Sequence, residues 1–458
     1  MTAAYDAIII GAGQAGPPLA GRLSAAGMTV ALIERKLFGG TCVNTGCIPT
    51  KTLVASAYAV HLARRAADFG FSTGGAVAVD MKAVKARKDA VSTRARKGVE
   101  TWLEGMERCT LHRGPARLLS PREVEVGDDR LTAPRIFLNV GGRAAIPDLP
   151  GKDRVTLLTN TTMLALDTLP RHLVVVGGSY VGLEFAQMYR RFGSAVTVVE
   201  KAPRLIPRED EEVSAAVKEI LEAEGITIRI DAECIRFAPH GDDIAVGAAC
   251  ASGPPEIVGS HVLLAVGRRP NTDDLGLDKA GVATDERGYI TVDDELRTSA
   301  PGIWALGDCN RRGAFTHTAY NDFEIVAANL LDGERRRVSD RVPGYALYID
   351  PPLGRAGMTL AEARASGRPL LLGHRPMSRV GRAIEKGETQ GFMTAIADAE
   401  THRILGAAIL GSGGDEAIHG ILDVMNAGLP YTALQRAVPI HPTVSELIPT
   451  LLGEMKPG

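Results

Sequence analysis

The sequence predicts an α/β protein that contains two strand–turn–helix–strand units and a separate C-terminal α+β domain. Residues 6–10 form a short buried-strand pattern that breaks into a glycine-rich turn, and residues 172–176 begin a second unit of the same kind. From about residue 341 the pattern changes to short apolar runs and two helix-like segments without such a turn. Alternating strands and helices indicate parallel sheets, whereas the C-terminal pattern is typical of an α+β domain.

The composition is that of an ordinary globular protein and excludes several classes of function. At 458 residues the chain is long enough for several domains, and its apolar share of 45% and charged share of 23% are typical values. A formal net charge of −2 gives no basic surface for nucleic acid or for an anionic membrane. No apolar run reaches the length of a membrane span. Six cysteines do not make a disulfide framework, so we expect a reducing, cytoplasmic location.

The first unit carries a complete GxGxxG pattern in Gly11, Gly13 and Gly16. These glycines open a helical stretch, and the next apolar run, residues 29–33, ends on Glu34. Such a turn lets a pyrophosphate approach the N-terminus of the helix, while the acidic side chain accepts a hydrogen bond from a ribose hydroxyl. With strands on both sides of it, the pattern predicts a dinucleotide site.

The second unit repeats this arrangement with one change. Gly177 and Gly182 frame the turn, and Glu200 ends the following strand at the same spacing as in the first unit. Ser179 replaces the second glycine and crowds the approach of a pyrophosphate. Two functional units would bind two dinucleotides and therefore indicate electron transfer between them. The alternative is one functional site and one relic.

Two cysteines, Cys42 and Cys47, lie between the units on a segment that contains Gly46 and leads into an apolar, helix-compatible stretch. Their spacing is short enough for one disulfide, and a helix N-terminus beside Cys47 would favour the thiolate that a reactive cysteine requires. The alternative is a pair of buried structural cysteines. The glycine-rich turns on either side favour redox chemistry. No second pair of cysteines or histidines stands at ligand spacing, so we predict no metal site.

Together these motifs resemble the class I pyridine nucleotide–disulfide oxidoreductases, the flavoprotein family of dihydrolipoamide dehydrogenase, glutathione reductase and mercuric reductase. The segment Gly-Gly-Thr-Cys-x4-Cys-Ile-Pro-x-Lys at residues 39–51 is the most specific part of the resemblance. The resemblance implies two Rossmann-like domains, one for FAD (1–145 and 271–335) and one for NAD(P) (146–270). A C-terminal α+β dimerisation domain (340–458) is implied after them.

The resemblance implies an NAD(P)H oxidoreductase in which electrons pass through FAD to a redox-active Cys42–Cys47 disulfide and on to a small disulfide or a metal ion. In that scheme Cys47 is the cysteine next to the flavin, and Cys42 exchanges with the substrate. Lys51 is implied to lie near the flavin ring with Glu184 as its carboxylate partner. Tyr180 is implied to be the aromatic gate over the nicotinamide pocket.

The cofactor contacts implied by the resemblance are spread along much of the chain. For FAD and NAD(P) together they comprise Gly11, Gly13, Gly16, Glu34, Gly40, Thr41, Lys51, Ala116, Gly141, Asp308, Phe315, Thr316, Gly177, Tyr180, Gly182, Glu200 and Gly267. The Glu200 carboxylate would repel a 2′-phosphate and bond a 2′-hydroxyl, which favours NADH over NADPH. Lys201 and Arg204 follow closely and could weaken that preference.

Residues 441–446, His-Pro-Thr-Val-Ser-Glu, resemble the acid/base element of the family. Reduction of a disulfide requires a group that protonates a leaving thiolate, and histidine titrates in the useful range. Glu446 would fix the tautomer of His441 and support its cationic form. In the family this histidine serves the cysteine pair of the other subunit, so the resemblance implies a homodimer with a shared active site.

The sequence leaves the electron acceptor open. Residues 350–359 and 315–317 resemble mercuric-reductase-like proteins and the reactive-chlorine-resistance reductases, but residues 453–458 lack the cysteine pair of full-type mercuric reductases. One alternative is a dihydrolipoamide dehydrogenase that acts on a lipoyl carrier protein. An alternative of another class is a redox-responsive, flavin-binding regulatory protein. The other cysteines are expected to be inert small apolar residues: Cys109, Cys234, Cys250 and Cys309.

Overall fold

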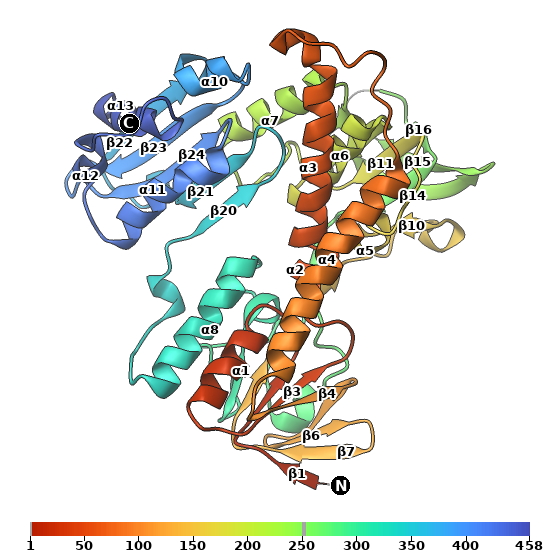
Figure 1. Cartoon of the computed structure of the whole chain (residues 1–458), viewed down its shortest axis with the longest axis vertical. Coiled ribbons are helices and arrows are strands. Elements are labelled where there is room, and N and C mark those ends of the chain that lie inside the picture. The colour runs from red at the N-terminus through yellow and green to blue at the C-terminus, as the bar shows by residue number, and fades with distance from the viewer. Residues whose placement is uncertain (1, 250–252) are drawn as a thin grey trace.

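The chain folds into three lobes in a computed structural model that describes residues 2–249 and 253–458 (Figure 1). Cys250, expected to be inert, lies outside these residues. In Figure 1 the lobe that contains the N-terminus lies at the bottom, and the C-terminal lobe lies at the upper left. The lobe at the upper right contains the second glycine-rich turn. Within the described residues, no helix combines the length and the apolar character needed to cross a membrane.

A parallel sheet forms the centre of the first lobe. Its order is β19 (Ile303–Ala305), β8 (Ile136–Leu138), β2 (Ala7–Ile10), β3 (Val30–Glu34) and β4 (Cys109–Arg113). One face packs against α1 (Gly16–Ala25) and α8 (Thr316–Leu331). The other face packs against a sheet of β1 (Thr2–Ala4), β7 (Asp129–Thr132), β6 (Glu123–Val126) and β5 (Ala116–Ser120). Cover on both faces explains why β2 and β3 are almost continuously apolar.

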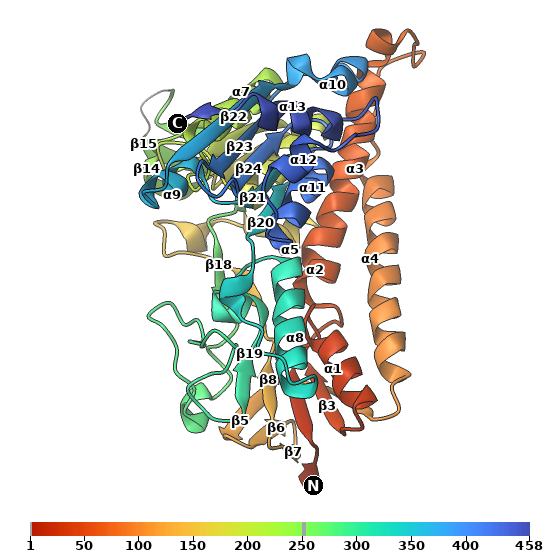
Figure 2. The same ribbon diagram turned by 90° about the vertical axis from the view of Figure 1, so that its left-hand side faces the viewer.

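Two long helices follow β3 and run side by side along the first two lobes (Figure 2). A short helix, α2 (Gly40–Thr45), leads directly into α3 (Cys47–Arg64), and α4 (Met81–Glu104) returns beside it. The side chain of Asp80 caps α4 by accepting hydrogen bonds from the first-turn backbone. The sequence predicts one or two long helices in this region, and the structure has two.

The second lobe is also built on a parallel sheet. Its order is β10 (Leu157–Leu158), β17 (His261–Leu264), β11 (His172–Val176), β12 (Ala195–Val199) and β13 (Thr227–Arg229). Its apolar cluster on one face includes side chains of α5 (Asn160–Met163), α6 (Tyr180–Phe192) and α7 (Glu211–Ala223). On the other face lies an antiparallel sheet that the sequence did not predict: β14 (Glu233–His240), β15 (Asp243–Ala249) and β16 (Glu256–Gly259).

The connection out of the second lobe corrects one expectation. The sequence predicts a single strand over residues 262–271, but the structure divides this run into β17 and β18 (Arg268–Pro270). Gly267, with φ +118°, turns the chain between them. Strand β18 then pairs with β9 (Gly142–Ala144), and this two-stranded ribbon carries the chain between the lobes.

The third lobe is a mainly antiparallel sheet with helices on it, as the C-terminal sequence predicts. Its order is β20 (Gly344–Leu347), β21 (Leu353–Gly357), β24 (Ile404–Leu410), β23 (Phe392–Asp398), β22 (Leu370–Pro376) and β25 (Lys456–Pro457). An apolar cluster joins it to α10 (Gly381–Glu385), α11 (Gly414–Asn426), α12 (Thr432–Gln435) and α13 (Ile448–Gly453), and α9 (Leu360–Ala365) packs on a smaller one. The sequence also predicts a helix over 444–452, but in the structure this helix is interrupted, because a 3-10 turn at Ser445–Leu447 precedes α13.

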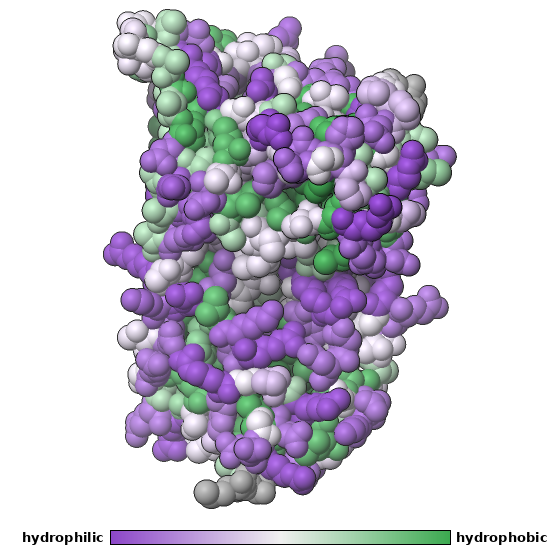
Figure 3. All heavy atoms as spheres, turned by 90° about the vertical axis from the view of Figure 1, so that its right-hand side faces the viewer, coloured by the Kyte–Doolittle hydropathy of each residue, from purple (hydrophilic) through white to green (hydrophobic). Residues whose placement is uncertain are grey.

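The lobes meet around α2 and the beginning of α3, which lie at the centre of the molecule (Figure 1). On the right-hand face of the molecule, apolar and nearly neutral residues gather in a hollowed band across the middle, while hydrophilic side chains cover most of the lower half (Figure 3). The architecture therefore places the cysteine segment between the two glycine-rich turns.

Candidate active site

The two cysteines lie on adjacent helices at the junction of the lobes. Cys42 is half-buried in α2, whereas Cys47 is the first residue of α3 and is exposed. Gly46 separates them, and a Cβ at this position would come within 2.9 Å of the carbonyl oxygen of Thr41. Only glycine lets the chain turn this tightly between the two helices. Both cysteines are free thiols in the structure.

The environment of the pair gives its two sulfurs opposite protonation preferences. The pKa of Cys47 is lowered to about 6, mainly by a hydrogen bond from Cys42 and further by Thr316 and Lys51, against the opposing effect of partial burial. The Thr316 hydroxyl lies 3.1 Å from the Cys47 sulfur. The same sulfur–sulfur hydrogen bond, together with burial, raises the pKa of Cys42. At neutral pH the pair therefore consists of a Cys47 thiolate and a Cys42 thiol.

Lys51 lies one turn beyond Cys47 on α3 and is paired with Glu184 of α6. Its Nζ is 2.7 Å and 2.9 Å from the two carboxylate oxygens. Glu184 is buried, and its Oε1 also accepts the backbone N–H of Tyr348 at 3.1 Å. The Tyr348 ring centroid lies 4.5 Å from Lys51 Nζ. A buried carboxylate and an aromatic face thus hold one cation near the Cys47 sulfur.

The first glycine-rich turn has the close backbone approaches that a bound pyrophosphate requires. Gly11 has φ +109°, and a Cβ there would come within 2.2 Å of the carbonyl oxygen of Asn139. A Cβ on Gly16 would lie 2.2 Å from the carbonyl oxygen of Gly11. Gly13 has more space, with the Asn139 side chain as its nearest contact at 3.2 Å. The turn at the start of α1 is therefore free of side chains that would block an anion.

The acidic residue at the end of β3 is fixed beside this turn. The carboxylate oxygens of Glu34 accept the backbone N–H groups of Ala12 at 2.9 Å and Lys36 at 2.8 Å. Gly40, with φ +62°, packs so closely on Gly13 that a Cβ would lie 2.8 Å from its Cα. This brings the cysteine-bearing helix onto the dinucleotide turn. The residues of this lobe therefore fit FAD: a bare turn for the pyrophosphate and an acid for a ribose.

A second acid, Asp308, lies in the turn that follows β19. Asp308 is half-buried, and burial raises its pKa, opposed by the Arg268 guanidinium 3.6 Å away. The predicted cofactor residues Phe315 and Thr316 follow this turn and begin α8. The chain therefore places Asp308 and the Cys47 partner Thr316 within one short segment.

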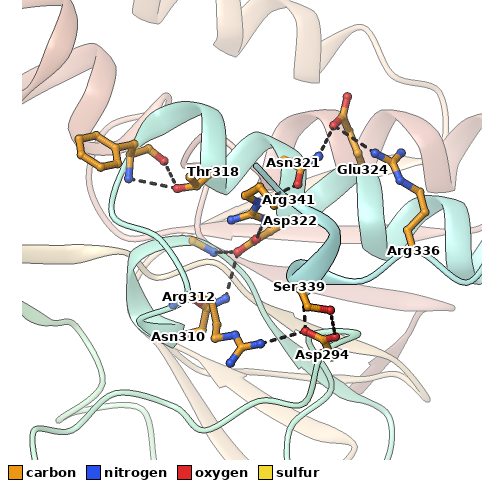
Figure 4. Close-up of polar contacts among 12 residues, drawn as sticks. Asp294, Asn310, Arg312, Thr318, Asn321, Asp322, Glu324, Arg336, Ser339 and Arg341 are labelled. Carbon is orange, nitrogen blue, oxygen red and sulfur yellow. Dashed lines mark hydrogen bonds and ion pairs between the residues drawn. The ribbon is translucent and has the colours of Figure 1, made fainter. Parts of the chain in front are cut away.

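The Asp308 turn is fixed by the buried side chain of Asp322 in α8 (Figure 4). One Asp322 oxygen accepts the backbone N–H of Gly307 at 2.8 Å and the amide of Asn310 at 3.0 Å. The other oxygen is paired with Arg341 at 2.5 Å, in the segment that leads to the third lobe. Because each oxygen has a charged or amide partner, the buried carboxylate is satisfied and the turn is rigid.

The second glycine-rich turn has the same geometry as the first. A Cβ on Gly182 would come within 2.0 Å of the carbonyl oxygen of Gly177. The carboxylate of Glu200 accepts the backbone N–H groups of Gly178 at 2.5 Å and Ala202 at 2.7 Å. This acid is therefore fixed at the end of β12 as Glu34 is fixed at the end of β3. The residues of this lobe fit a second dinucleotide.

Tyr180 lies in a cluster of three aromatic rings contributed by the three lobes. The rings of Phe315 and Tyr345 stack with centroids 5.4 Å apart and planes 6° apart. Tyr180 meets Phe315 at 6.4 Å and 81°, and Tyr345 at 5.8 Å and 85°. Phe315, which contacts the predicted gate Tyr180, directly precedes Thr316, and the Thr316 hydroxyl contacts the Cys47 sulfur.

His441 and Glu446 form a hydrogen-bonded pair on the surface of the third lobe. The His441 Nδ1 lies 2.8 Å from the Glu446 carboxylate, and the imidazole is 81% exposed. Val438 and Ile440, just before it, are exposed apolar residues. In the described part of the chain, the hydrogen-bond partner of His441 is Glu446, whereas Cys47 bonds to Cys42 and Thr316.

The remaining predicted residues lie within the first lobe or at its boundary with the second. The Thr41 hydroxyl is 3.5 Å from the Arg268 guanidinium, and Ala116 is buried at the start of β5. Gly141 (φ +63°) and Gly267 (φ +118°) flank the β9–β18 ribbon. The two glycines therefore lie at the boundary of the first two lobes, whereas Ala116 lies inside the first lobe.

Several polar groups that fix the site residues in place are not predicted from the sequence: Asn139, Glu209, Asp322, Tyr345 and Tyr348. None of them belongs to a recognisable short motif, because each meets its partner only through tertiary contacts. The one available signal was for Asp322, an acid three residues before the apolar run 325–328 of a helix-compatible stretch. Such an acid, if buried, needs a fixed partner.

Two dinucleotide-type sheets with a polarised cysteine pair between them define the class of pyridine nucleotide–disulfide oxidoreductases, and the chain belongs to that family. The family model described as pyridine nucleotide-disulphide oxidoreductase matches residues 5–322, and the model of the dimerisation domain matches residues 343–452. The protein is thus an oxidoreductase and a flavoprotein that uses FAD and a pyridine nucleotide. The expected fold class is confirmed.

Three relatives show how the chain stands within the family. The probable pyridine nucleotide-disulfide oxidoreductase RclA of Escherichia coli K12 is 36% identical over 99% of both chains. The dihydrolipoyl dehydrogenase of Thermus scotoductus is 36% identical over 96% of this chain and 95% of its own. The mercuric reductase of Streptomyces lividans is 33% identical over 97% and 94%. A solved structure titled as a Cu(II) complex of the HOCl-induced flavoprotein disulfide reductase RclA from Escherichia coli has a TM-score of 0.89 at 35% identity, covering 98% of this chain and 99% of that one.

Proposed function

We propose that the protein takes electrons from NAD(P)H and delivers them through the Cys42–Cys47 pair to a small disulfide or a metal ion. The observation that carries the proposal is the polarised sulfur pair: an exposed Cys47 with a pKa of about 6, beside a protonated Cys42 and the Lys51–Glu184 ion pair. FAD, when bound in the first lobe, supplies two-electron transfer between the nicotinamide and the sulfurs.

The residues of the pair have different tasks in this scheme. Two electrons and one proton, taken together from NAD(P)H through the flavin, break the Cys42–Cys47 disulfide and leave Cys47 as the thiolate and Cys42 as the thiol. The side chains of Thr316 and Lys51 stabilise the negative charge on Cys47. Cys42 loses its proton and attacks the substrate disulfide, and the first substrate thiolate leaves and takes up that proton. The Cys47 thiolate then attacks the Cys42 sulfur, which reforms the disulfide and releases the second half of the substrate as a thiolate that is protonated from solvent.

Cys42 needs a base because its environment holds the proton on its sulfur. We assign this task to His441 of the partner subunit, which would take the Cys42 proton and return it to the leaving thiolate. Its pairing with Glu446 and its high exposure leave the other ring nitrogen available to a second subunit. The exposed Val438 and Ile440 support burial of this segment in a homodimer.

Two observations support a metal ion as an electron acceptor in addition to a small disulfide. The relatives include a mercuric reductase and an RclA whose solved structure is titled as a Cu(II) complex. Thiolates are soft ligands suited to such ions. Within the described residues, no group of three or more His, Cys, Asp or Glu side chains is arranged to hold a metal. A metal substrate would therefore be bound by the sulfur pair itself.

A second candidate is dihydrolipoamide dehydrogenase activity on a lipoyl carrier. The 36% identity to the Thermus scotoductus dihydrolipoyl dehydrogenase and the His441–Glu446 pair favour it. In that direction the same residues would oxidise a dithiol and pass the electrons to NAD+.

For the coenzyme we propose NADH, because the fixed Glu200 carboxylate would lie where a 2′-phosphate would have to bind.

The decisive experiment is an anaerobic screen of FAD-loaded protein with NADH and NADPH side by side. The acceptors are lipoamide, glutathione disulfide, Hg(II) and Cu(II), and NAD+ with dihydrolipoamide tests the reverse direction. We expect NADH-dependent reduction of a disulfide or metal ion that is lost in Cys47→Ser. Rapid oxidation of dihydrolipoamide beside negligible reduction of the other acceptors would favour the second candidate instead. Absence of turnover with every acceptor would favour a regulatory flavoprotein and refute the proposal.

A further inference from the structure

A buried carboxylate with no role in the scheme above, Glu209, lies where the second and third lobes meet. The residue is 2% exposed. Its Oε1 accepts hydrogen bonds from two tyrosine hydroxyls, Tyr180 at 2.8 Å and Tyr345 at 2.7 Å. Its Oε2 accepts two more from Arg355, at 3.0 Å from Nε and 2.7 Å from Nη2. Four donors therefore converge on one carboxylate.

Arg355 fixes this carboxylate from the third lobe. Its side chain in β21 is fully buried, and it forms a second ion pair with Asp210 at 2.6 Å. Asp210 in turn accepts the backbone N–H of Leu360 at 2.8 Å. A buried carboxylate is tolerated only with such a partner, and a guanidinium that donates through two nitrogens sets its position and orientation. The Oε1 atom is thereby held toward the two hydroxyls.

The bond to Glu209 completes the restraint of the Tyr180 ring. The ring packs nearly perpendicular to the rings of Phe315 and Tyr345, and its hydroxyl donates a hydrogen bond to Glu209. Tyr345 shares the same carboxylate oxygen, so the two rings are fixed to one point. Three lobes therefore contribute to the position of one side chain.

We infer that Glu209 is a positioning residue for the nicotinamide site. Glu209 holds the Tyr180 ring over the pocket, and Arg355 of the dimerisation domain fixes Glu209 in turn. The inference rests on the proposed function and on the resemblance, which implies that Tyr180 is the gate over that pocket. A ring that moves aside for the nicotinamide gives up its bond to Glu209. Because only the moved-aside form admits the nicotinamide, the bond lowers the apparent affinity for the coenzyme.

The test is the Tyr180→Phe variant, which keeps the ring and removes the hydroxyl. Binding is measured by titration calorimetry of the oxidised, FAD-loaded protein with NAD+, and with ADP-ribose, which lacks the nicotinamide. We expect the dissociation constant for NAD+ to fall about three- to tenfold, while that for ADP-ribose stays within about twofold, because only the nicotinamide displaces the ring. A variant that merely loosened the fold would weaken both ligands.

The matched control is Tyr58→Phe. The Tyr58 hydroxyl donates a hydrogen bond to the Glu388 carboxylate at 2.5 Å, so this change also removes a tyrosine–carboxylate bond. Tyr58, however, lies three turns beyond Cys47 on α3. We expect it to change neither dissociation constant. Glu209→Gln, which removes the charge but keeps the shape, should tighten NAD+ binding in the same direction, and Tyr180→Phe decides alone if that variant does not fold.

The inference is overturned if Tyr180→Phe leaves the NAD+ affinity unchanged or weakens it, or if the ADP-ribose affinity changes by the same factor. Failure of the wild-type protein to bind NAD+ or NADP+ and to have its flavin reduced would be a different result. That outcome would refute the proposed function, and with it the role of Glu209.

Discussion

The polarity of the sulfur pair depends mainly on one hydrogen bond, so removing its donor should change the chemistry of Cys47. In the structure the pKa of Cys47 is about 6 instead of its usual 9.0, and the hydrogen bond from Cys42 is the largest cause. Thr316 and Lys51 contribute less. In Cys42→Ala the thiolate loses its main donor, while partial burial still disfavours the charge. We therefore expect the pKa of Cys47 to rise from about 6 toward 9.

This change is large in terms of thiolate at neutral pH. At pH 7 a thiol with a pKa of about 6 is about 90% ionised, whereas one with a pKa of 9 is about 1% ionised. The alkylation rate at a single pH would understate the difference, because a thiolate of higher pKa is intrinsically more nucleophilic. The midpoint of the pH–rate profile is the quantity that separates the two effects.

The assay is anaerobic alkylation of the reduced protein with iodoacetamide over a range of pH, with the Cys47 peptide followed by mass spectrometry. Wild type should show a midpoint near pH 6, and Cys42→Ala a midpoint well above it. Cys42→Ser retains an O–H donor at the same position and is the matched control, with a midpoint close to wild type. Equal midpoints in wild type and Cys42→Ala would refute the assignment of the low pKa to this hydrogen bond.

Three further changes test the residues around the pair. Glu184→Gln removes the charge that Lys51 is paired with, so we expect the free energy of unfolding in denaturant to fall by about 1–3 kcal/mol; no loss would mean that the pair is solvated. The methyl group added in Gly13→Ala has the Asn139 side chain as its nearest contact, at 3.2 Å, so the variant should fold with a wild-type circular dichroism spectrum but purify without FAD. Normal flavin absorbance in this variant would contradict the assignment of the first glycine-rich turn to the FAD pyrophosphate. Mixed refolding of inactive Cys47→Ser and His441→Ala chains should restore activity in the heterodimer, whereas no recovery would place both groups in one subunit.

The parts of the fold that the sequence predicts are those in which chemistry is local. The turn at Gly11 is recognisable because a strand, a bare turn and a helix follow one another within a few residues. The same holds for Cys47, whose place at the start of α3 follows from its immediate neighbours. In these segments the order of neighbouring residues is enough to determine the backbone geometry.

The parts that the sequence did not predict depend on contacts between distant segments. Glu209 meets Tyr345 and Arg355 across more than a hundred residues, and nothing near it in the chain indicates a buried position. Tyr348 reaches Lys51 only because β20 ends beside α3. The β14–β16 sheet was missed for a similar reason: its strands cover the back of the second parallel sheet and carry no motif of their own.

The central claim is that a Cys47 thiolate forms beside the flavin when NADH reduces the protein. Anaerobic titration of the FAD-loaded protein with NADH, followed by absorbance, tests it most directly. We predict a long-wavelength thiolate–flavin absorption band that grows with added NADH and is missing in Cys47→Ser. A fully FAD-loaded wild-type protein that is reduced by NADH without this band would contradict the account.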